Sequence, residues 1–93
     1  MPDYPSLPHQ VYIIRSIPYP SQTYIGYTTD FTTRLFDHNR GHSAHTAKYL
    51  PWRPEVVISL PEKQTALALE EYLKSHSGKA FANKRLLRVM DKD

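Results

Sequence analysis

The sequence contains no cysteine, and this absence excludes several kinds of small protein. Without thiols the chain can form neither a disulfide framework nor a thiolate zinc cluster, and such chains are typical of reducing compartments. The sequence also lacks an apolar run long enough to span a membrane. Its first ten residues, MPDYPSLPHQ, lack the basic and apolar pattern of a secretion signal. We therefore expect a soluble, cytoplasmic protein.

Acidic residues are too few to balance the basic ones. Twelve Lys and Arg face nine Asp and Glu, and five His can add positive charge as the pH falls. The resulting formal charge of +3 suits a polyanionic partner without proving one. A length of 93 residues allows one modest core, so we expect a single domain with a single site.

Proline and β-branched residues indicate how the chain is divided. Three prolines among the first eight residues favour an extended arm over residues 1–9. The segments VYIIRSI (residues 11–17) and TYIGYT (residues 23–28) are rich in β-branched and aromatic residues, which predicts two antiparallel strands. EVVISL (residues 55–60) predicts a third strand, and its uninterrupted apolar run is typical of a central or well-covered strand.

Capping signals mark two predicted helices. Asp30 is a good N-cap and Gly41 a good C-terminal stop, which predicts a helix of about ten residues between them. Ser59 and Glu62 have the spacing of a capping box, which would open a second helix. We expect this second helix to end at Gly78.

The remaining segments complete the predicted fold. Residues 42–54 show no periodicity and are expected to form a loop. KAFANKRLLRVM (residues 79–90) predicts a strongly basic last helix, followed by a frayed tail at residues 91–93. We therefore predict an α+β fold over residues 10–90, in which a small three-stranded antiparallel sheet is flanked by three helices.

Polar side chains on two of the predicted helices are directed toward one region. On a helical wheel, Arg34 and His38 lie one turn apart beside an apolar stripe, and Glu70 lies at the edge of the stripe of the second helix. Each also has an ordinary explanation. His38 can complement the helix dipole, Arg34 can pair with a nearby aspartate, and Glu70 can pair with Lys74.

Two tyrosines complete an ordered set of residues. Tyr12 lies in QVYIIR and Tyr24 opens the tripeptide YIG, and each alone suits a pleated, half-buried surface. Together with the stretches YIGYTTDFTTRLFDHNRG, ALALEEYLKS and GKAFANKRL, however, the sequence resembles the GIY-YIG endonuclease superfamily over residues 10–88. It looks closest to the small single-domain bacterial members. The tripeptide Gln10-Val11-Tyr12 departs from Gly-Ile-Tyr in its first two letters and keeps the tyrosine.

The resemblance implies a DNA endonuclease that hydrolyses phosphodiester bonds with Mg²⁺ (or Mn²⁺). By position, it implies that the catalytic residues are Tyr12, Tyr24, Arg34 and His38, and that Glu70 binds the metal. We expect Tyr12 to help activate the attacking water with His38 as proton acceptor, although these two roles can be exchanged. A tyrosine with an ordinary pKa is a poor base at neutral pH, so we expect a nearby cation to lower the pKa of Tyr12.

The segment between the first predicted helix and the third predicted strand carries basic and aromatic side chains, which would form a surface beside this site that is suited to phosphate contact and base stacking. Trp52, within it, is expected in the core. Tyr27 stands where some relatives have a lysine, and Asn83 matches a late polar site residue of the family more loosely. The residues expected to contact substrate are Gly26, Tyr27, His45, Lys48, Arg53, Asn83 and Lys84.

Two other readings stay open at this point. One is a non-catalytic nucleic-acid-binding module on the same scaffold, although such a module has no need of Glu70. The other is a transition-metal site made of His38, His42 and His45, which Gly41 disfavours by interrupting the helix that would align them. We expect a monomer or homodimer that acts on DNA in repair or recombination and selects DNA structure rather than sequence.

Overall fold

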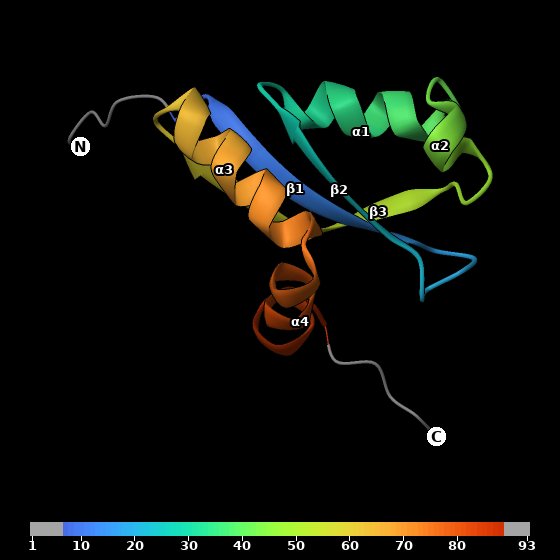
Figure 1. Cartoon of the computed structure of the whole chain (residues 1–93). Coiled ribbons are helices and arrows are strands. Elements are labelled where there is room, and N and C mark those ends of the chain that lie inside the picture. The colour runs from blue at the N-terminus through green and yellow to red at the C-terminus, as the bar shows by residue number, and fades with distance from the viewer. Residues whose placement is uncertain (1–6, 89–93) are drawn as a thin grey trace, which may run out of the picture.

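The computed structural model describes residues 7–88 and confirms the predicted fold class, an antiparallel sheet with helices packed on it (Figure 1). No helix of this part of the chain is long and apolar enough to cross a membrane. The elements, in chain order, are β1 (His9–Ser16), β2 (Thr23–Thr28), α1 (Phe31–Asn39), α2 (Ala44–Ala47), β3 (Trp52–Leu60), α3 (Lys63–Lys74) and α4 (His76–Arg85).

The three strands have the order β2-β1-β3, and both pairs are antiparallel. The prediction of a central or well-covered third strand is therefore wrong, because β3 is an edge strand and β1 is the central one. The reason is visible in the two strands: Val11 to Ser16 of β1 are all buried, whereas β3 contains Pro54 and leaves Val57 41% exposed. Proline cannot donate to a ladder and is confined to edges and bulges.

The alternation of β1 divides the interior into two clusters, one on each face of the sheet. Val11 and Ile13 pack against residues of α3 and α4, namely Ala66, Leu73 and Ala82. Tyr12, Ile14 and Trp52 form the other cluster, together with side chains of α1. Figure 1 correspondingly shows α1 and α2 together, apart from α3 and α4. Trp52 is 4% exposed, which confirms its core position.

The predicted caps are correct for one helix and wrong for the other. Asp30 is the N-cap of α1, and its side chain accepts a hydrogen bond from the Thr33 amide at 3.2 Å. The predicted capping box does not form, because Ser59 belongs to β3. Glu62 itself is the N-cap of α3 and makes no side-chain capping bond. Hence the helix begins at Lys63, beyond the predicted box.

Gly78 does not end a helix, contrary to the prediction. Helix α3 stops at Lys74, and Ser75 is both its C-cap and the N-cap of α4, where the Ser75 hydroxyl accepts a hydrogen bond from the Gly78 amide at 3.1 Å. Gly78 thus lies in the first turn of α4. Glycine is required there by close approach, since a Cβ at this position would lie 1.7 Å from the carbonyl oxygen of Tyr72.

The segment expected to be a loop, residues 42–54, contains α2 and the first residues of β3. Helix α2 is a single short helical element, too brief to give a periodic signal. Of the predicted N-terminal arm, only residues 7–9 are described, and His9 already belongs to β1. Residues 1–6 of that arm and the predicted tail at residues 91–93 lie outside the described residues.

Candidate active site

The side chain of Tyr12 lies across the neighbouring strand, β2, and the absence of a side chain at Gly26 makes this possible. The two residues are direct partners in the antiparallel pairing of β1 and β2. A Cβ on Gly26 would lie 2.4 Å from the Tyr12 hydroxyl oxygen and 2.9 Å from its Cε2 atom. The glycine therefore lets the tyrosine ring rest on the backbone of β2 and carries its hydroxyl group toward the outer edge of the sheet.

A buried chain of hydrogen bonds connects this hydroxyl group to α1 and α2. The Tyr12 hydroxyl oxygen lies 2.9 Å from Nε2 of His38, and Nδ1 of His38 lies 2.8 Å from Oγ1 of Thr46. Tyr12, His38 and Thr46 are 1%, 3% and 1% exposed. The Thr46 hydroxyl group in turn donates toward the carbonyl oxygen of Ser43 at 3.5 Å.

The direction of these bonds follows from the donors and acceptors that are present. When the Thr46 hydroxyl group donates to the Ser43 carbonyl oxygen, it can accept a hydrogen bond from Nδ1 of His38. The other ring nitrogen, Nε2, then accepts the Tyr12 hydroxyl proton. In this arrangement His38 is neutral and is oriented to take a proton from Tyr12.

Burial governs the pKa values of both titrating groups in this chain. Burial lowers the pKa of His38 below its ordinary value, and Arg34 lowers it further, while Asp37 opposes them. Burial also raises the pKa of Tyr12, with additional raising by Tyr24 and Glu70, against an opposing effect of Arg34. The expectation that a nearby cation brings the pKa of Tyr12 below its ordinary value is therefore wrong: Arg34 acts in that direction, but burial prevails.

Tyr24 packs beside the hydrogen-bonded pair. Its ring centroid lies 5.1 Å from that of His38 in an edge-on arrangement and 6.3 Å from that of Tyr12. Phe31, at the start of α1, covers the Tyr12 ring at 5.2 Å. On its other side Tyr24 meets His45 edge-on at 6.5 Å. Tyr24 is thus half-buried between the chain of hydrogen bonds and the surface formed by α2.

Two charged residues act on the Tyr12 hydroxyl group from different helices. Arg34, exposed on α1 one turn before His38, and Glu70, on α3, both influence the pKa of Tyr12. The sequence prediction that two helices direct Arg, His and Glu toward one region stays a prediction, which these effects on the pKa of Tyr12 support. Neither Asp30 nor Asp37 forms an ion pair with Arg34 among the described residues.

Glu70, the residue predicted to bind a metal ion, is partly accessible on α3. Its side chain is 20% exposed, and Oε2 forms an ion pair with Nζ of Lys74 at 3.2 Å, so its ordinary helical partner is also present. One accessible carboxylate is sufficient for Mg²⁺, which retains several water ligands. Within residues 7–88, no three His, Asp or Glu side chains gather closely enough to hold a metal ion, so His38, His42 and His45 do not form such a site.

A groove of about 660 Å³ extends from Tyr24 around the edge of β2. The predicted His45 of α2 and Lys48, which follows α2, line one side, and residues of α4 line the other, including the predicted Asn83. Lys74 and Lys79 add positive charge, and no carboxylate of the described chain lines the groove. Aromatic rings and cations along one groove are suited to a nucleic-acid strand.

The structure places four of the predicted substrate residues away from this groove. Gly26 is buried within β2 and does not line the groove. Tyr27 lies on the face of the sheet covered by α3, where its hydroxyl group is 2.7 Å from Nδ1 of His9. Arg53 lies on β3 and contacts Glu55. Lys84 is exposed on α4 and does not line the groove. Their proposed contacts with substrate stay predictions.

Sequence reasoning missed two residues that position the site. Thr46 holds His38, but it stands in an aperiodic segment where no spacing distinguishes it. Gln10 replaces the glycine of the Gly-Ile-Tyr motif, and its Oε1 accepts a hydrogen bond from the Phe31 amide at 2.9 Å. It thereby binds the first turn of α1 to the central strand. The departure of Gln10 from the motif was the one signal that could have drawn attention to it.

Comparisons with known proteins identify the family of this chain. The chain is 38% identical over 87 residues to Structure-specific endonuclease subunit SLX1 of Malassezia globosa. The match covers 88% of this chain and 18% of that protein, so the chain spans about a fifth of the length of this relative. Residues 8–85 match the GIY-YIG catalytic domain family, including Tyr12, Gly26, His38 and Glu70. The chain therefore belongs to the GIY-YIG family.

Proposed function

We propose that this domain is a metal-dependent DNA endonuclease that hydrolyses phosphodiester bonds in DNA repair or recombination and selects DNA structure rather than sequence. The observation that carries the proposal is the buried chain Tyr12–His38–Thr46, whose hydroxyl end lies within the influence of Arg34 and Glu70. The similarity to a fungal protein named as a structure-specific endonuclease subunit supports the preference for DNA structure.

Tyr12 and His38 act together on the proton of the attacking water. Hydrolysis needs a deprotonated nucleophile, and a free tyrosinate is not available because burial raises the pKa of Tyr12. His38 is neutral and accepts from Tyr12, so Tyr12 can take the water proton while it passes its own to Nε2. In this scheme His38 is the final proton acceptor, and Tyr12 is the relay that reaches the water.

Arg34 and Glu70 supply the charges that the phosphate requires. The guanidinium group of Arg34 is always protonated, and its planar set of donors suits the charge that builds on phosphoryl oxygens. Glu70 would hold Mg²⁺ or Mn²⁺, which supplies a Lewis acid for the phosphate and its leaving oxygen when bound. Tyr24, half-buried beside His38, is placed to orient the water or the phosphate.

A binding module without catalysis is the alternative function. The basic groove alone would serve it. A module that only binds DNA has no need of a tyrosine and a histidine buried in a chain of hydrogen bonds. Burying such groups also carries a risk, because each one left unpaired costs about 1–3 kcal/mol. The presence of that chain favours the nuclease.

The test uses neighbouring glutamates on α3 as a matched pair. Glu70 belongs to the site, whereas Glu71 is exposed on the same helix. Labelled duplex, branched and single-stranded DNA would be incubated with Mg²⁺ or Mn²⁺ and with wild type, Glu70→Ala or Glu71→Ala protein. We expect cleavage by wild type and Glu71→Ala and none by Glu70→Ala, at equal thermal stability. Salt-dependent DNA binding without cleavage by wild type would instead support the binding module.

A further inference from the structure

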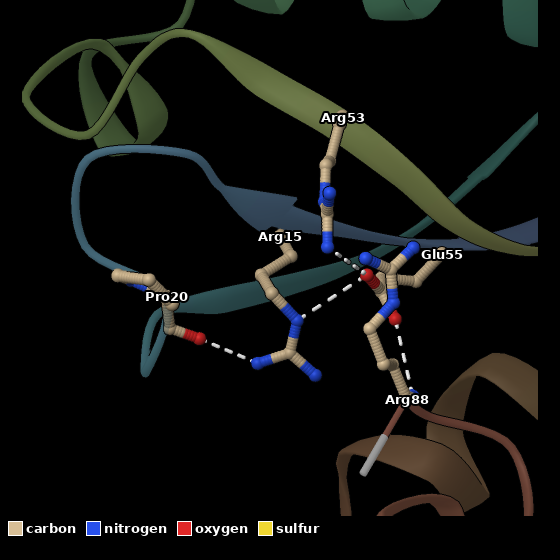
Figure 2. Close-up of polar contacts among 5 residues, drawn as sticks. All are labelled: Arg15, Pro20, Arg53, Glu55 and Arg88. Carbon is tan, nitrogen blue, oxygen red and sulfur yellow. Dashed lines mark hydrogen bonds and ion pairs between the residues drawn. The ribbon is translucent and has the colours of Figure 1, made fainter. Parts of the chain in front are cut away.

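A second group of charged residues lies at the far end of the sheet, away from the catalytic face. Glu55 of β3 is its centre, with a side chain that is 3% exposed. Its Oε2 atom lies 3.3 Å from Nε of Arg15 and 3.5 Å from Nη2 of Arg53, and its Oε1 atom accepts the backbone amide of Arg88 at 3.2 Å. In Figure 2 the Arg88 side chain also points back toward this carboxylate.

The strand pairing explains why these residues meet. Arg15 and Arg53 are direct partners across the β1–β3 ladder, an arrangement in which like charges repel. The register shifts between Ile13 and Ile14, which pair with Val56 and Pro54, so Glu55 is the extra residue of a β-bulge. Bulges redirect side chains and are frequent beside functional sites. Here the bulge turns one carboxylate toward two arginines.

The cluster keeps more positive charge and more donors than it uses. Each guanidinium group has five N–H donors, while Glu55 offers two oxygens, one of which is taken by the Arg88 amide. Arg15 also donates to the Pro20 carbonyl oxygen, yet its buried Nε has no hydrogen bond of good geometry among the described residues. The Arg15 side chain is 7% exposed. A buried donor in this state favours an additional acceptor.

A small pocket of about 150 Å³ opens beside these guanidinium groups. Its walls are Arg15, Ser16, Ile17, Pro20 and Arg53, and no carboxylate of the described chain lines it. Figure 2 shows Arg15 between the carbonyl group of Pro20 and the carboxylate of Glu55. The pocket is thus positive, supplied with donors and of a size that accommodates a phosphate group.

We propose that Arg15 and Arg53 form a second phosphate site, which holds a backbone phosphodiester of the nucleic acid outside the cleaved bond. The proposal rests on the proposed function for its source of phosphate. Ile13 lines the groove and lies two residues from Arg15 on the same face of β1, about 7 Å along the strand. The two cavities share no lining residue, so a nucleic-acid strand in the groove would have to continue beyond it to reach this pocket.

The first test compares two cation-to-amide variants. Arg53→Gln removes the more accessible guanidinium group, whose side chain is 38% exposed, and Lys63→Gln removes an exposed charge at the start of α3, outside both pockets. DNA affinity would be measured by fluorescence anisotropy in EDTA at several salt concentrations. We expect Arg53→Gln to weaken binding roughly 3- to 10-fold and to reduce the salt slope by about 0.7–0.9, the value of one lost phosphate contact.

Lys63→Gln is expected to leave affinity and slope unchanged. Equal affinity and slope for Arg53→Gln and wild type would overturn the phosphate site while leaving the nuclease proposal intact. Conversely, if the wild type cleaves no DNA but Arg53→Gln still weakens DNA binding, the nuclease proposal is refuted and the phosphate site is retained. Inorganic phosphate is the second probe: if it raises the Tm of wild type but not of Arg53→Gln, while DNA affinity is the same, the pocket takes free phosphate and the proposed backbone contact is wrong.

Glu55→Gln separates a phosphate site from a purely structural cluster. The amide oxygen can still accept the Arg88 backbone amide, but the negative charge is gone. We therefore expect a lower Tm together with DNA binding that is several-fold tighter, because the arginines lose their counter-charge. A fall in affinity equal to that of Arg53→Gln would show that the cluster only positions the end of α4, and would overturn the proposal. Should this variant not fold, the Arg53→Gln comparison alone decides.

Discussion

The Tyr12 hydroxyl group and Nε2 of His38 lie 2.9 Å apart although 26 residues separate them in the chain. The contact joins the central strand to the last turn of α1, and both side chains are almost fully buried. Since His38 is held from its other nitrogen by Thr46, the imidazole cannot rotate away without breaking a second bond. In the tautomer that carries its proton on Nδ1, Nε2 of His38 is the acceptor for the Tyr12 hydroxyl proton, and a proton can move from Tyr12 to His38.

Cleavage is expected to decline as the pH falls below 6.5, the ordinary pKa of histidine. Burial lowers the pKa of His38, so the neutral acceptor is present at neutral pH and is lost only as the pH passes through that lower value. The measurement is a pH–rate profile under single-turnover conditions with metal in excess. A cleavage rate that increases as the pH is lowered from 6.5 to 5 would contradict the role of neutral His38 as proton acceptor.

The same shift predicts the pH dependence of stability. A lowered folded-state pKa means that the unfolded chain binds the proton more readily, so the contribution of His38 is complete above 6.5 and is lost as the pH falls through the folded pKa. The free energy of unfolding of the wild type, measured in urea, should decrease as the pH falls through this range. The decrease should be smaller for His38→Gln. As a control, His76→Gln, exposed at the start of α4, should retain the wild-type dependence.

Thr46→Val is predicted to slow cleavage by about tenfold or more while DNA affinity is retained. Valine keeps the shape of threonine but offers no acceptor to Nδ1 of His38, so the imidazole loses the partner that sets its tautomer. An unpaired buried donor should also cost about 1–3 kcal/mol of unfolding free energy. Thr46→Ser restores the hydroxyl group and should recover the rate. Loss of stability with an unchanged rate would limit Thr46 to a structural role.

Gly26→Ala is predicted to abolish cleavage by displacing the Tyr12 ring. The new methyl group would fall 2.4 Å from the hydroxyl oxygen, and a buried ring has no free space into which it can shift. Overpacking of this kind costs about 1–3 kcal/mol. The displacement can be followed through the chemical shift of the His38 ring protons, since the bond to Nε2 would break. Wild-type activity in the variant would show that the site tolerates another Tyr12 position.

Much of the architecture was predictable because it depends on neighbouring residues. The β-branched strands and the Asp30 cap follow from local pattern, and the structure agrees with them. The wheel positions of Arg34, His38 and Glu70 also follow from local pattern, and their roles at one site stay a prediction. The family motif then supplied which of these residues belong together. Local pattern and motif were sufficient to indicate the site because most of its side chains lie on regular elements.

The remainder depends on contacts between distant segments, which local pattern does not encode. Thr46 and Gln10 act through partners eight and twenty-one residues away. The direction of the Tyr12 pKa shift was predicted wrongly because it is decided by burial, which requires the packed fold. The bulge at Glu55 is likewise a property of strand register. In each case the sequence names the residue but not its environment.

Gly78→Ala tests the most local of the corrected predictions. By helix propensity alone, alanine inside α4 should stabilise the protein by roughly 1 kcal/mol over glycine. The structure predicts the opposite sign, because the added Cβ would lie 1.7 Å from the Tyr72 carbonyl oxygen, which is backbone and cannot turn aside. We expect a net loss of about 1–3 kcal/mol of unfolding free energy in urea titrations.

Ser77→Ala is the matched control for Gly78→Ala, because Ser77 is exposed on the neighbouring position of α4 and should change stability by less than about 0.5 kcal/mol. A stabilised Gly78→Ala protein would mean that α3 and α4 do not approach each other as closely as described. A destabilised Gly78→Ala protein should also bind DNA less tightly, because displacement of α4 would move Lys79 and Asn83 away from the groove that they line.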